Sequence, residues 1–230
     1  MEVTNLYGQF CPVSMASEII CTRWTPLVLR ELLCGSARFN DIRRGVPKMS
    51  PTLLSKRLKE LELAGVIRSV EGPGGKAEYR LTQAGEELRP LIVGIGSWGQ
   101  RWVESRLSLR NLDPSLLMWD IRRNFEPVPR PADRCTVQFQ YHDAGDQLQD
   151  WWLVVESDDI DLCKFDPGFD VDVLIASDLR SMTAVWMGLA KLSEELESGR
   201  ITIDGAPTLT NQVQDWLKLS IFANEPRKVS

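Results

Sequence analysis

The chain has 230 residues, of which 43% are hydrophobic and 26% are charged. This balance is typical of globular proteins, and the length fits two domains of roughly 100–130 residues each. No apolar run reaches the ~18–20 residues of a membrane span, and the first residues lack the basic start and apolar core of a secretory signal. We therefore expect a cytoplasmic protein with no membrane partner.

The reactive residue types argue against catalysis and metal binding. The five cysteines are odd in number and form no C-x-x-C pair, so they suggest neither a disulfide framework nor a zinc cage. A histidine-based metal site or a catalytic triad would have to use His142, the one histidine of the chain. We expect no enzyme activity, no cofactor and no metal.

Charge divides the chain into two halves of opposite sign. Residues 1–108 hold 15 Lys/Arg against 11 Asp/Glu, a net charge of +4, whereas residues 109–230 hold 12 against 21, a net charge of −9. Residues 38–59 carry seven basic residues and one acid. Contact with a polyanion is therefore expected only from the first half, and phosphate contact from this basic stretch.

The first half has helical periodicity followed by a hairpin pattern. It predicts helices over residues 12–21, 39–44 and 51–64, a further helix between the first two that Thr22 or Thr25 caps and that ends at Gly35, strands over 66–70 and 77–81, and one more helix that Thr82 caps. The strands are joined by the glycine-rich turn 72–76, and the last helix carries an apolar face from Leu88 to Trp102. We expect a mostly helical domain over residues 1–108 with a two-stranded wing.

The fourth predicted helix has the features of a major-groove reader. Ser50 can cap it, Pro51 suits its first turn, and Gly65 suits its end. Leucines at i, i+4 and i+7 form one face, and the opposite face is short, polar and basic, as a helix that contacts base edges and phosphates requires. An ordinary amphipathic surface helix explains the same pattern, and periodicity alone favours that alternative.

The hairpin after this helix shifts the interpretation, because helix followed by wing is the winged-helix order. Several segments resemble, in the same order, the HxlR family of MarR-like regulators: residues 11–12, 23–32, 38–42, 50–61 and 78–82. The resemblance spans about residues 8–105. It implies a winged helix-turn-helix that binds double-stranded DNA as a homodimer, joined through the terminal helices.

The resemblance also implies roles for individual residues. By position, bases would be contacted by Ser50, Thr52, Ser55 and Lys56. Arg57 and Lys59 would contact phosphate or brace the helix, and Lys76 of the wing would reach the backbone or the minor groove. The wing tip is short and rich in glycine, which would make its DNA contact slight.

Two further motifs lie in the first half. Residues 94–99 spell G-x-G-x-x-G, but the apolar spacing before them is helical, so close helix packing explains these glycines better than a dinucleotide site. Cys11 precedes the first helix, at a position where some family members resemble redox sensors. A helix N-terminus lowers the pKa of a thiol, whereas a buried, inert cysteine is the simpler alternative.

The second half indicates a junction and an α+β domain. Residues 109–134 contain several prolines and a short helix around 116–125, and residues 135–230 form the domain. The pattern predicts strands at 135–141, 151–155, 160–165, 169–175 and 200–203, and helices at 177–192 and 208–222. Its many aspartates lack calcium-site spacing, so solvated acids are expected.

Residues 112–222 resemble a sterol carrier protein type 2-like domain, on the segments 177–179 and 195–205. This resemblance implies an apolar tunnel for an acyl chain or a sterol. The residues we expect to line such a ligand site are Trp151, Met182, Trp186 and Leu189. Met182, Trp186 and Leu189 stand at i, i+4 and i+7, a spacing that equally fits a closed core.

Together these features predict a DNA-binding transcription regulator, a homodimer on an inverted-repeat operator, whose C-terminal domain binds an apolar small molecule and modulates DNA binding. The alternative is a lipid-binding or small-hydrophobe-binding protein in which the winged helix serves regulation or partner contact.

Overall fold

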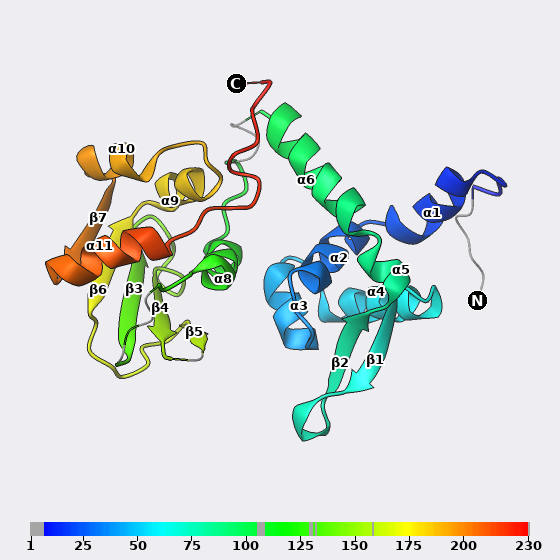
Figure 1. Ribbon diagram of the computed structural model, residues 1–230, viewed down its shortest axis with the longest axis horizontal. Coiled ribbons are helices and arrows are strands. Elements are labelled where there is room, and N and C mark those ends of the chain that lie inside the picture. The colour runs from blue at the N-terminus through cyan, green and yellow to red at the C-terminus, as the bar shows by residue number, and fades with distance from the viewer. Residues whose placement is uncertain (1–6, 105–108, 129–130, 132, 158, 230) are drawn as a thin grey trace. The chain divides into compact units, whose positions relative to one another are not determined.

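The computed structural model describes residues 7–104, 109–128, 131, 133–157 and 159–229 (Figure 1). The chain divides into two compact units, Met1–Gly96 and Ser97–Ser230. The boundary falls inside a helix, and each unit is considered by itself below. Pro129 and Arg130 of the expected junction lie outside the described residues.

The first unit follows the expected order of elements closely. The elements are α1 (Pro12–Ile20), α2 (Thr25–Leu33), α3 (Phe39–Gly45), α4 (Pro51–Leu63), β1 (Ile67–Glu71), β2 (Ala77–Leu81) and α5 (Gln83–Glu86). Strands β1 and β2 pair antiparallel, with Ile67 opposite Leu81. Thr82 caps α5 by accepting a hydrogen bond from the Gly85 N–H, as expected.

One element of the first unit differs from expectation: the single helix after Thr82 is two helices. The second, α6 (Arg89–Trp102), begins with a proline in its first turn. Pro90 lacks an N–H and cannot continue the hydrogen bonds of α5, but it is well tolerated where a new helix starts. The G-x-G-x-x-G sequence lies inside α6, which confirms that it is helical.

The core of the first unit lies between α2, α3, α4 and the wing. Val28, Leu29 and Ile42 are fully buried, and Leu54 and Leu58 of α4 pack into the same cluster. The leucine face of α4 therefore fixes the helix against α2 and α3, and its opposite face is left to solvent.

The second unit places helices against a mixed sheet. Its elements are the end of α6, α8 (Pro114–Asn124), β3 (Cys135–Tyr141), β4 (Asp150–Val155), β5 (Ile160–Cys163), β6 (Val173–Ser177), α9 (Leu179–Trp186), α10 (Leu192–Glu197), β7 (Ile201–Gly205) and α11 (Pro207–Trp216). In the described residues the sheet has five strands in the order β5-β4-β3-β6-β7, with β3 and β6 parallel and the other neighbours antiparallel. This is the expected α+β arrangement.

Alternation along the strands decides which face of the sheet the helices cover. Val137, Phe139 and Tyr141 of β3 are buried in one hydrophobic cluster with residues of α8, α9 and α11. Gln138 and Gln140, between them, point to the other face and are half-buried. The core therefore lies on the helix side of the sheet.

Four boundaries of the second unit were predicted wrongly. Strand β6 begins at Val173 rather than 169, because Asp172 exchanges hydrogen bonds with the backbone of Thr136 and only then does the chain enter the sheet. Helix α9 is capped by Asp178 rather than Ser177 and ends at Trp186, six residues early. Helix α11 ends at Trp216 rather than 222.

The early end of α9 has a clear physical cause. Gly188 has φ +70°, the left-handed conformation that ends helices, and a Cβ on it would lie 2.4 Å from the backbone oxygen of Ala223. The Leu189 N–H donates to the backbone oxygen of Ala184 (2.8 Å), the kind of bond that closes a helix at such a glycine, and the nearby C-terminal segment leaves no space for a side chain at Gly188.

The same C-terminal segment also caps the end of α6. Arg227 donates to the backbone oxygens of Gln100 (3.1 Å) and Val103 (2.7 Å), and Arg101 pairs with Glu225. A guanidinium at a helix C-terminus satisfies orphan carbonyls and complements the helix dipole. The end of α6 is therefore an integral part of the second unit.

Candidate nucleic-acid interface

Helix α4 presents one face to solvent, and that face is polar and basic. The Ser50 side chain accepts a hydrogen bond from the Leu53 N–H, which confirms the predicted cap, and Gly65 follows with φ +71°. Leu54, Leu58 and Leu61 are at most 2% exposed. The exposed residues on the rest of the helix include four of the predicted contacts, Thr52, Ser55, Lys56 and Lys59.

Arg57 braces α4 instead of extending into solvent. Its Nε donates to the backbone oxygen of Arg23 (3.2 Å), and its guanidinium pairs with Glu60 one turn along α4. Only 15% of the Arg57 side chain is exposed. Of the two roles expected for Arg57, this geometry supports the brace, which holds α4 against the start of α2.

A buried carboxylate holds α2 to the end of α3. Glu31 is fully buried, accepts from the Ser36 hydroxyl (3.2 Å) and pairs with Arg30 (2.8 Å). Arg30 also donates to the backbone oxygen of Gly45 (2.7 Å). A Cβ at Gly45 would come within 1.9 Å of the Glu31 carboxyl carbon, so only glycine fits at the turn that leads into α4.

The wing is tied to the same helices. The Tyr79 N–H of β2 donates to the backbone oxygen of Ala37 (2.8 Å), and Arg38 forms a β-bridge with Glu78. The buried Glu78 pairs with both Arg38 (3.4 Å) and Arg80 (2.5 Å), so its single negative charge offsets one of their two positive charges. At the tip, Gly74 and Gly75 have positive φ, and Lys76 beside them is exposed.

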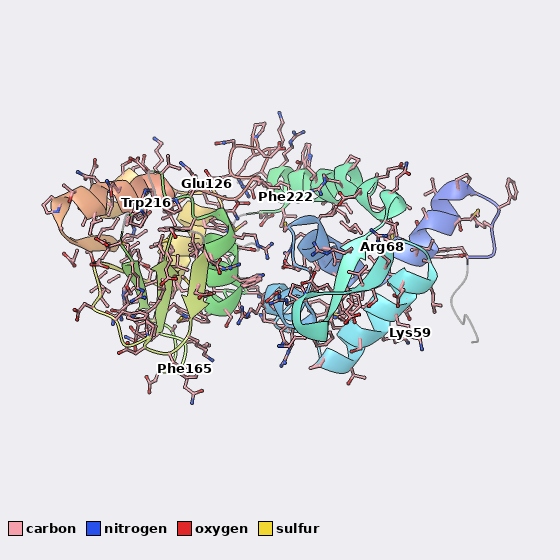
Figure 2. The ribbon with its side chains drawn as sticks, turned by 60° about the horizontal axis from the view of Figure 1, so that its bottom comes forward. Lys59, Arg68, Glu126, Phe165, Trp216 and Phe222 are labelled. Carbon is pink, nitrogen blue, oxygen red and sulfur yellow. The ribbon has the colours of Figure 1, made fainter. Side chains whose placement is uncertain are left out.

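Several cations of this unit are not balanced by a carboxylate. Lys56 is 3.9 Å from Glu60 in an exposed i, i+4 pair, a contact of small energy. In the part of the unit that the structure describes, six exposed cations have no ion pair: Arg23, Arg43, Lys48, Lys59, Arg68 and Lys76. Figure 2 shows Lys59 on α4 and Arg68 on β1.

Sequence reasoning singled out Lys59 and Lys76 individually but missed Arg68. The alternation of β1 contained the signal, because Ile67 is buried and Arg68, next to it, must point outward. Arg43 and Lys48 were included only as part of the basic stretch.

Cys11 lies at the start of α1 and is exposed. It is the N-cap residue, and hydrogen bonding to the backbone N–H groups of Ser14 and then Val13 lowers the pKa of its thiol. This is the environment that was expected to make the thiol reactive.

The four residues expected to line a ligand site are separated into two groups. Trp151, Met182 and Trp186 are buried together in the core of the second unit. Leu189 lies beyond the end of α9 and outside that cluster, so the predicted stripe at i, i+4 and i+7 does not form. The error follows from the turn at Gly188, a glycine in the left-handed conformation that ends α9 and that the prediction overlooked.

Within the described residues, no group of histidines, cysteines and acids is arranged to hold a metal ion. None of the helices there is long and apolar enough to cross a membrane.

Helices α2, α3 and α4, with a polar face of α4 exposed, are followed by the two-stranded wing. This arrangement defines the first unit as a winged helix-turn-helix. A family model described as HxlR-like helix-turn-helix matches residues 19–107. The HTH-type transcriptional regulator YvaP of Bacillus subtilis is 38% identical over 100 residues, which cover 42% of this chain and 93% of YvaP. The chain belongs to the HxlR-like helix-turn-helix family.

Other similar proteins match over the same share of the chain. The HTH-type transcriptional regulator YdeP of Bacillus subtilis is 38% identical over 94 residues, covering 40% of this chain and 73% of YdeP. Among solved structures, the reduced form of the transcriptional regulator YodB from B. subtilis is 28% identical, covers 40% of this chain and 93% of its own, and has a TM-score of 0.36.

Proposed function

We propose that the protein is a cytoplasmic transcription regulator that binds double-stranded DNA as a homodimer, with α4 of each protomer in the major groove. The observation that carries this proposal is the division of α4 into a buried leucine face and an exposed face of Thr52, Ser55, Lys56 and Lys59. Threonine, serine and lysine donors near a helix N-terminus can reach base edges, and unpaired lysines can meet phosphates. Membership in a family with relatives named as transcriptional regulators supports the same function.

The exposed apolar residues support the dimer. Around α1, Phe10 is 98% exposed and Val13 is 73% exposed, and α6 exposes Ile95, Trp98 and Trp102. Large apolar side chains grouped on a helix surface typically mark a protein interface. Two identical reading helices require an operator that is an inverted repeat, with half-sites about one helical turn apart, ~10 base pairs or a multiple.

The DNA-binding proposal is tested by selecting binding sequences from a random library and measuring affinities on the selected site. We expect Thr52→Ala and Lys56→Ala each to cost about 1–3 kcal/mol on that site and less on unrelated DNA. Lys218→Ala is the matched control, because Lys218 is exposed but lies in the acidic unit. Wild-type discrimination in both α4 variants, or an asymmetric single half-site, would contradict the proposal.

The dimer is tested by sedimentation of two charge substitutions of exposed apolar residues. Ile95→Glu is expected to shift the protein toward the monomer and to weaken operator binding. Val128→Glu changes a side chain that is 76% exposed in the second unit and should leave the mass unchanged. A wild-type protein that is monomeric at the concentrations used for DNA binding would refute the dimer.

We further propose that the second unit binds an apolar small molecule and thereby changes operator affinity. The support is the resemblance of residues 112–222 to a sterol carrier protein type 2-like domain, together with the cluster of Trp151, Met182 and Trp186 between α9 and the sheet. Because these side chains are buried, a ligand would have to separate α9 from the sheet. An allosteric ligand must bind the DNA-competent and incompetent forms with different affinities, typically by about 1–3 kcal/mol.

The test is calorimetry of the full chain with oleate and with cholesterol sulfate, followed by operator titration in their presence. Binding that changes operator affinity supports a ligand-responsive regulator. Binding with unchanged operator affinity favours the alternative, a lipid-binding or small-hydrophobe-binding protein whose winged helix serves regulation or partner contact. Absence of binding would leave the second unit with a structural role.

A further inference from the structure

An open hollow lies on the sheet of the second unit, on the face opposite the helices. Its floor is Trp152 of β4, which points away from the core because Trp151 and Leu153 on either side of it are buried there. The β3–β4 connection, with Asp146, and the β5–β6 connection, with Phe165, form its sides. In Figure 2, Phe165 and Trp216 of α11 lie at opposite sides of the unit.

The size of the hollow suits a small organic molecule. Its volume is about 470 Å³, within the range of roughly 300–1,000 Å³ that is usual for ligand sites. Phe165 contributes a ring that is 80% exposed, although core packing accounts for most large aromatic side chains of this unit. Two aromatic faces, one half-buried and one exposed, are thus available to a molecule in the hollow.

The carboxylates around these rings lack positive partners. Asp150 Oδ1 accepts from the side-chain amides of Gln138 (3.0 Å) and Gln140 (3.1 Å), which hold it on the sheet face. Asp166 Oδ1 accepts only from the Gly168 N–H (2.8 Å). Among the described residues, none of the three carboxylates that line the hollow forms an ion pair: Asp146, Asp150 and Asp166.

One lysine lines the same hollow, so the net charge of its lining is −2. Lys164 is exposed and makes no ion pair with any described residue. The carboxylates do not form a group that could hold a metal ion in the described chain. Negative charge is therefore spread around the aromatic floor instead of converging on one point, which suits a bulky cation better than a compact one.

We infer that this hollow binds a hydrophobic organic cation, such as a quaternary ammonium or phosphonium compound with aromatic substituents. A cation over the face of Trp or Phe is attracted by the ring quadrupole, and surrounding carboxylates add long-range attraction. The aromatic substituents of the cation would pack on Trp152 and Phe165. This site is distinct from the α4 surface and from the apolar cluster under α9, so it does not depend on either proposed function.

The test is calorimetry of the full chain with tetraphenylphosphonium and tetraphenylborate, two ions of nearly the same size and shape but opposite charge. Sodium buffers are used, because potassium tetraphenylborate precipitates. We expect the phosphonium to bind with 1:1 stoichiometry per chain and the borate not to bind at the same concentrations. Equal binding of the two ions, or no binding of the phosphonium at 1 mM (about the weakest affinity worth calling a site), would overturn the proposal.

Paired variants assign the binding to the hollow. The double variant Asp146→Asn with Asp166→Asn should raise the Kd for the phosphonium at least about tenfold, equivalent to about 1.4 kcal/mol. Phe165→Ala should raise it several-fold. The matched controls are Asp204→Asn, an exposed acid on β7, and Phe169→Ala, an exposed aromatic of the same connection that does not line the hollow.

Each outcome with the variants decides the proposal. A loss of affinity confined to the hollow variants supports it. An equal loss in the controls would mean that the phosphonium responds to the overall negative charge of the unit, and no loss in any variant would mean that it binds elsewhere. Both results would overturn the assignment.

Discussion

The two units have net charges of opposite sign, and in each of them residues of the minority sign are held in ion pairs. Residues 1–96 hold 13 Lys/Arg and 10 Asp/Glu, a net charge of +3, and residues 97–230 hold 14 and 22, a net charge of −8. In the first unit, buried Glu31 and Glu78 form ion pairs with arginines. In the second unit, ion pairs with acidic side chains are formed by Arg122, Arg134 and Arg200.

After this pairing both units still expose charges of both signs, and the exposed charges without an ion pair include several of the majority sign. The first unit is left with unpaired lysines on α4 and the wing, and the second with unpaired aspartates around Trp152. Net charge alone would have predicted only the signs. The ion pairs show where charged side chains lack a partner of opposite charge. Two such places are the surfaces for which we propose ligands: a polyanion for the first unit and an organic cation for the second.

The largest expected effect is a substitution that destabilises the first unit and leaves the stability of the second unit unchanged. Gly45→Ala would place a methyl group on the buried Glu31 carboxyl, and displacing that carboxyl would break its pairing with Arg30. We expect a loss of about 3 kcal/mol or more, the usual cost of breaking a buried charge network. Hydrogen exchange resolved by segment should show lost protection in α2, α3 and α4 and unchanged protection in β3 and β6.

Two companion glycines sharpen this prediction. Gly188→Ala combines a positive φ with a contact to Ala223 and should reduce protection only in the second unit, by about 1–3 kcal/mol. Gly145→Ala meets nothing within 4 Å and should change stability by less than about 0.5 kcal/mol. A uniform loss of protection in both units on Gly45→Ala would show that they do not unfold separately.

The ends of the helices show what the sequence could and could not predict. Ser50 and Gly65 act on residues within four positions of themselves, so the boundaries of α4 were predicted closely. Gly188 is the same kind of local signal at the end of α9 and was overlooked, whereas its closeness to Ala223, which is distant in sequence, could not be predicted from a local pattern.

The candidate sites follow the same rule. The exposed face of α4 was predictable, because periodicity alone places Thr52 and Lys56 opposite the leucines. The bracing of Arg57 by a backbone oxygen 34 positions away was not, and neither was the hollow over Trp152, because two loops distant in sequence form it.

A smaller effect compares the helix caps of the two units. Ser50→Ala removes one hydrogen bond to the start of α4 and should cost about 1 kcal/mol of local stability. Asp178→Ala removes two, from the Ser181 N–H and the Ser181 hydroxyl, and should cost up to about 2 kcal/mol at the start of α9. Ser55→Ala on the exposed face of α4 is the control for Ser50. Hydrogen exchange at the first turn of each helix measures the losses, and equal effects of Ser50→Ala and Ser55→Ala would refute the cap assignment.

The smallest effect concerns the cysteine thiols, because the pKa is lowered for one thiol of the first unit and raised for one of the second. Backbone N–H groups of Ser14 and Val13 lower the pKa of exposed Cys11, whereas burial, followed by the nearby Asp172 carboxylate, raises the pKa of Cys135 to about 11. A lowered pKa means that more thiolate is present at a given pH, so Cys11 should be alkylated faster at pH 7 than Cys21 or Cys34. These two are also exposed, but they lie at the C-terminal ends of α1 and α2 and not at a helix start.

The expected advantage of Cys11 is less than about tenfold, because the nucleophilicity of a thiolate falls as its pKa falls. It should shrink as the pH rises above the lowered pKa of Cys11, because the thiolate fraction of Cys11 then stops increasing, and buried Cys135 should stay unmodified in the folded protein throughout. Iodoacetamide labelling followed by peptide mass spectrometry between pH 6 and 9 measures all four rates. If Cys11 reacted no faster than Cys21 and Cys34 at pH 7, its position at the start of α1 would confer no reactivity, and the expectation of a redox-sensing thiol would lose its physical basis.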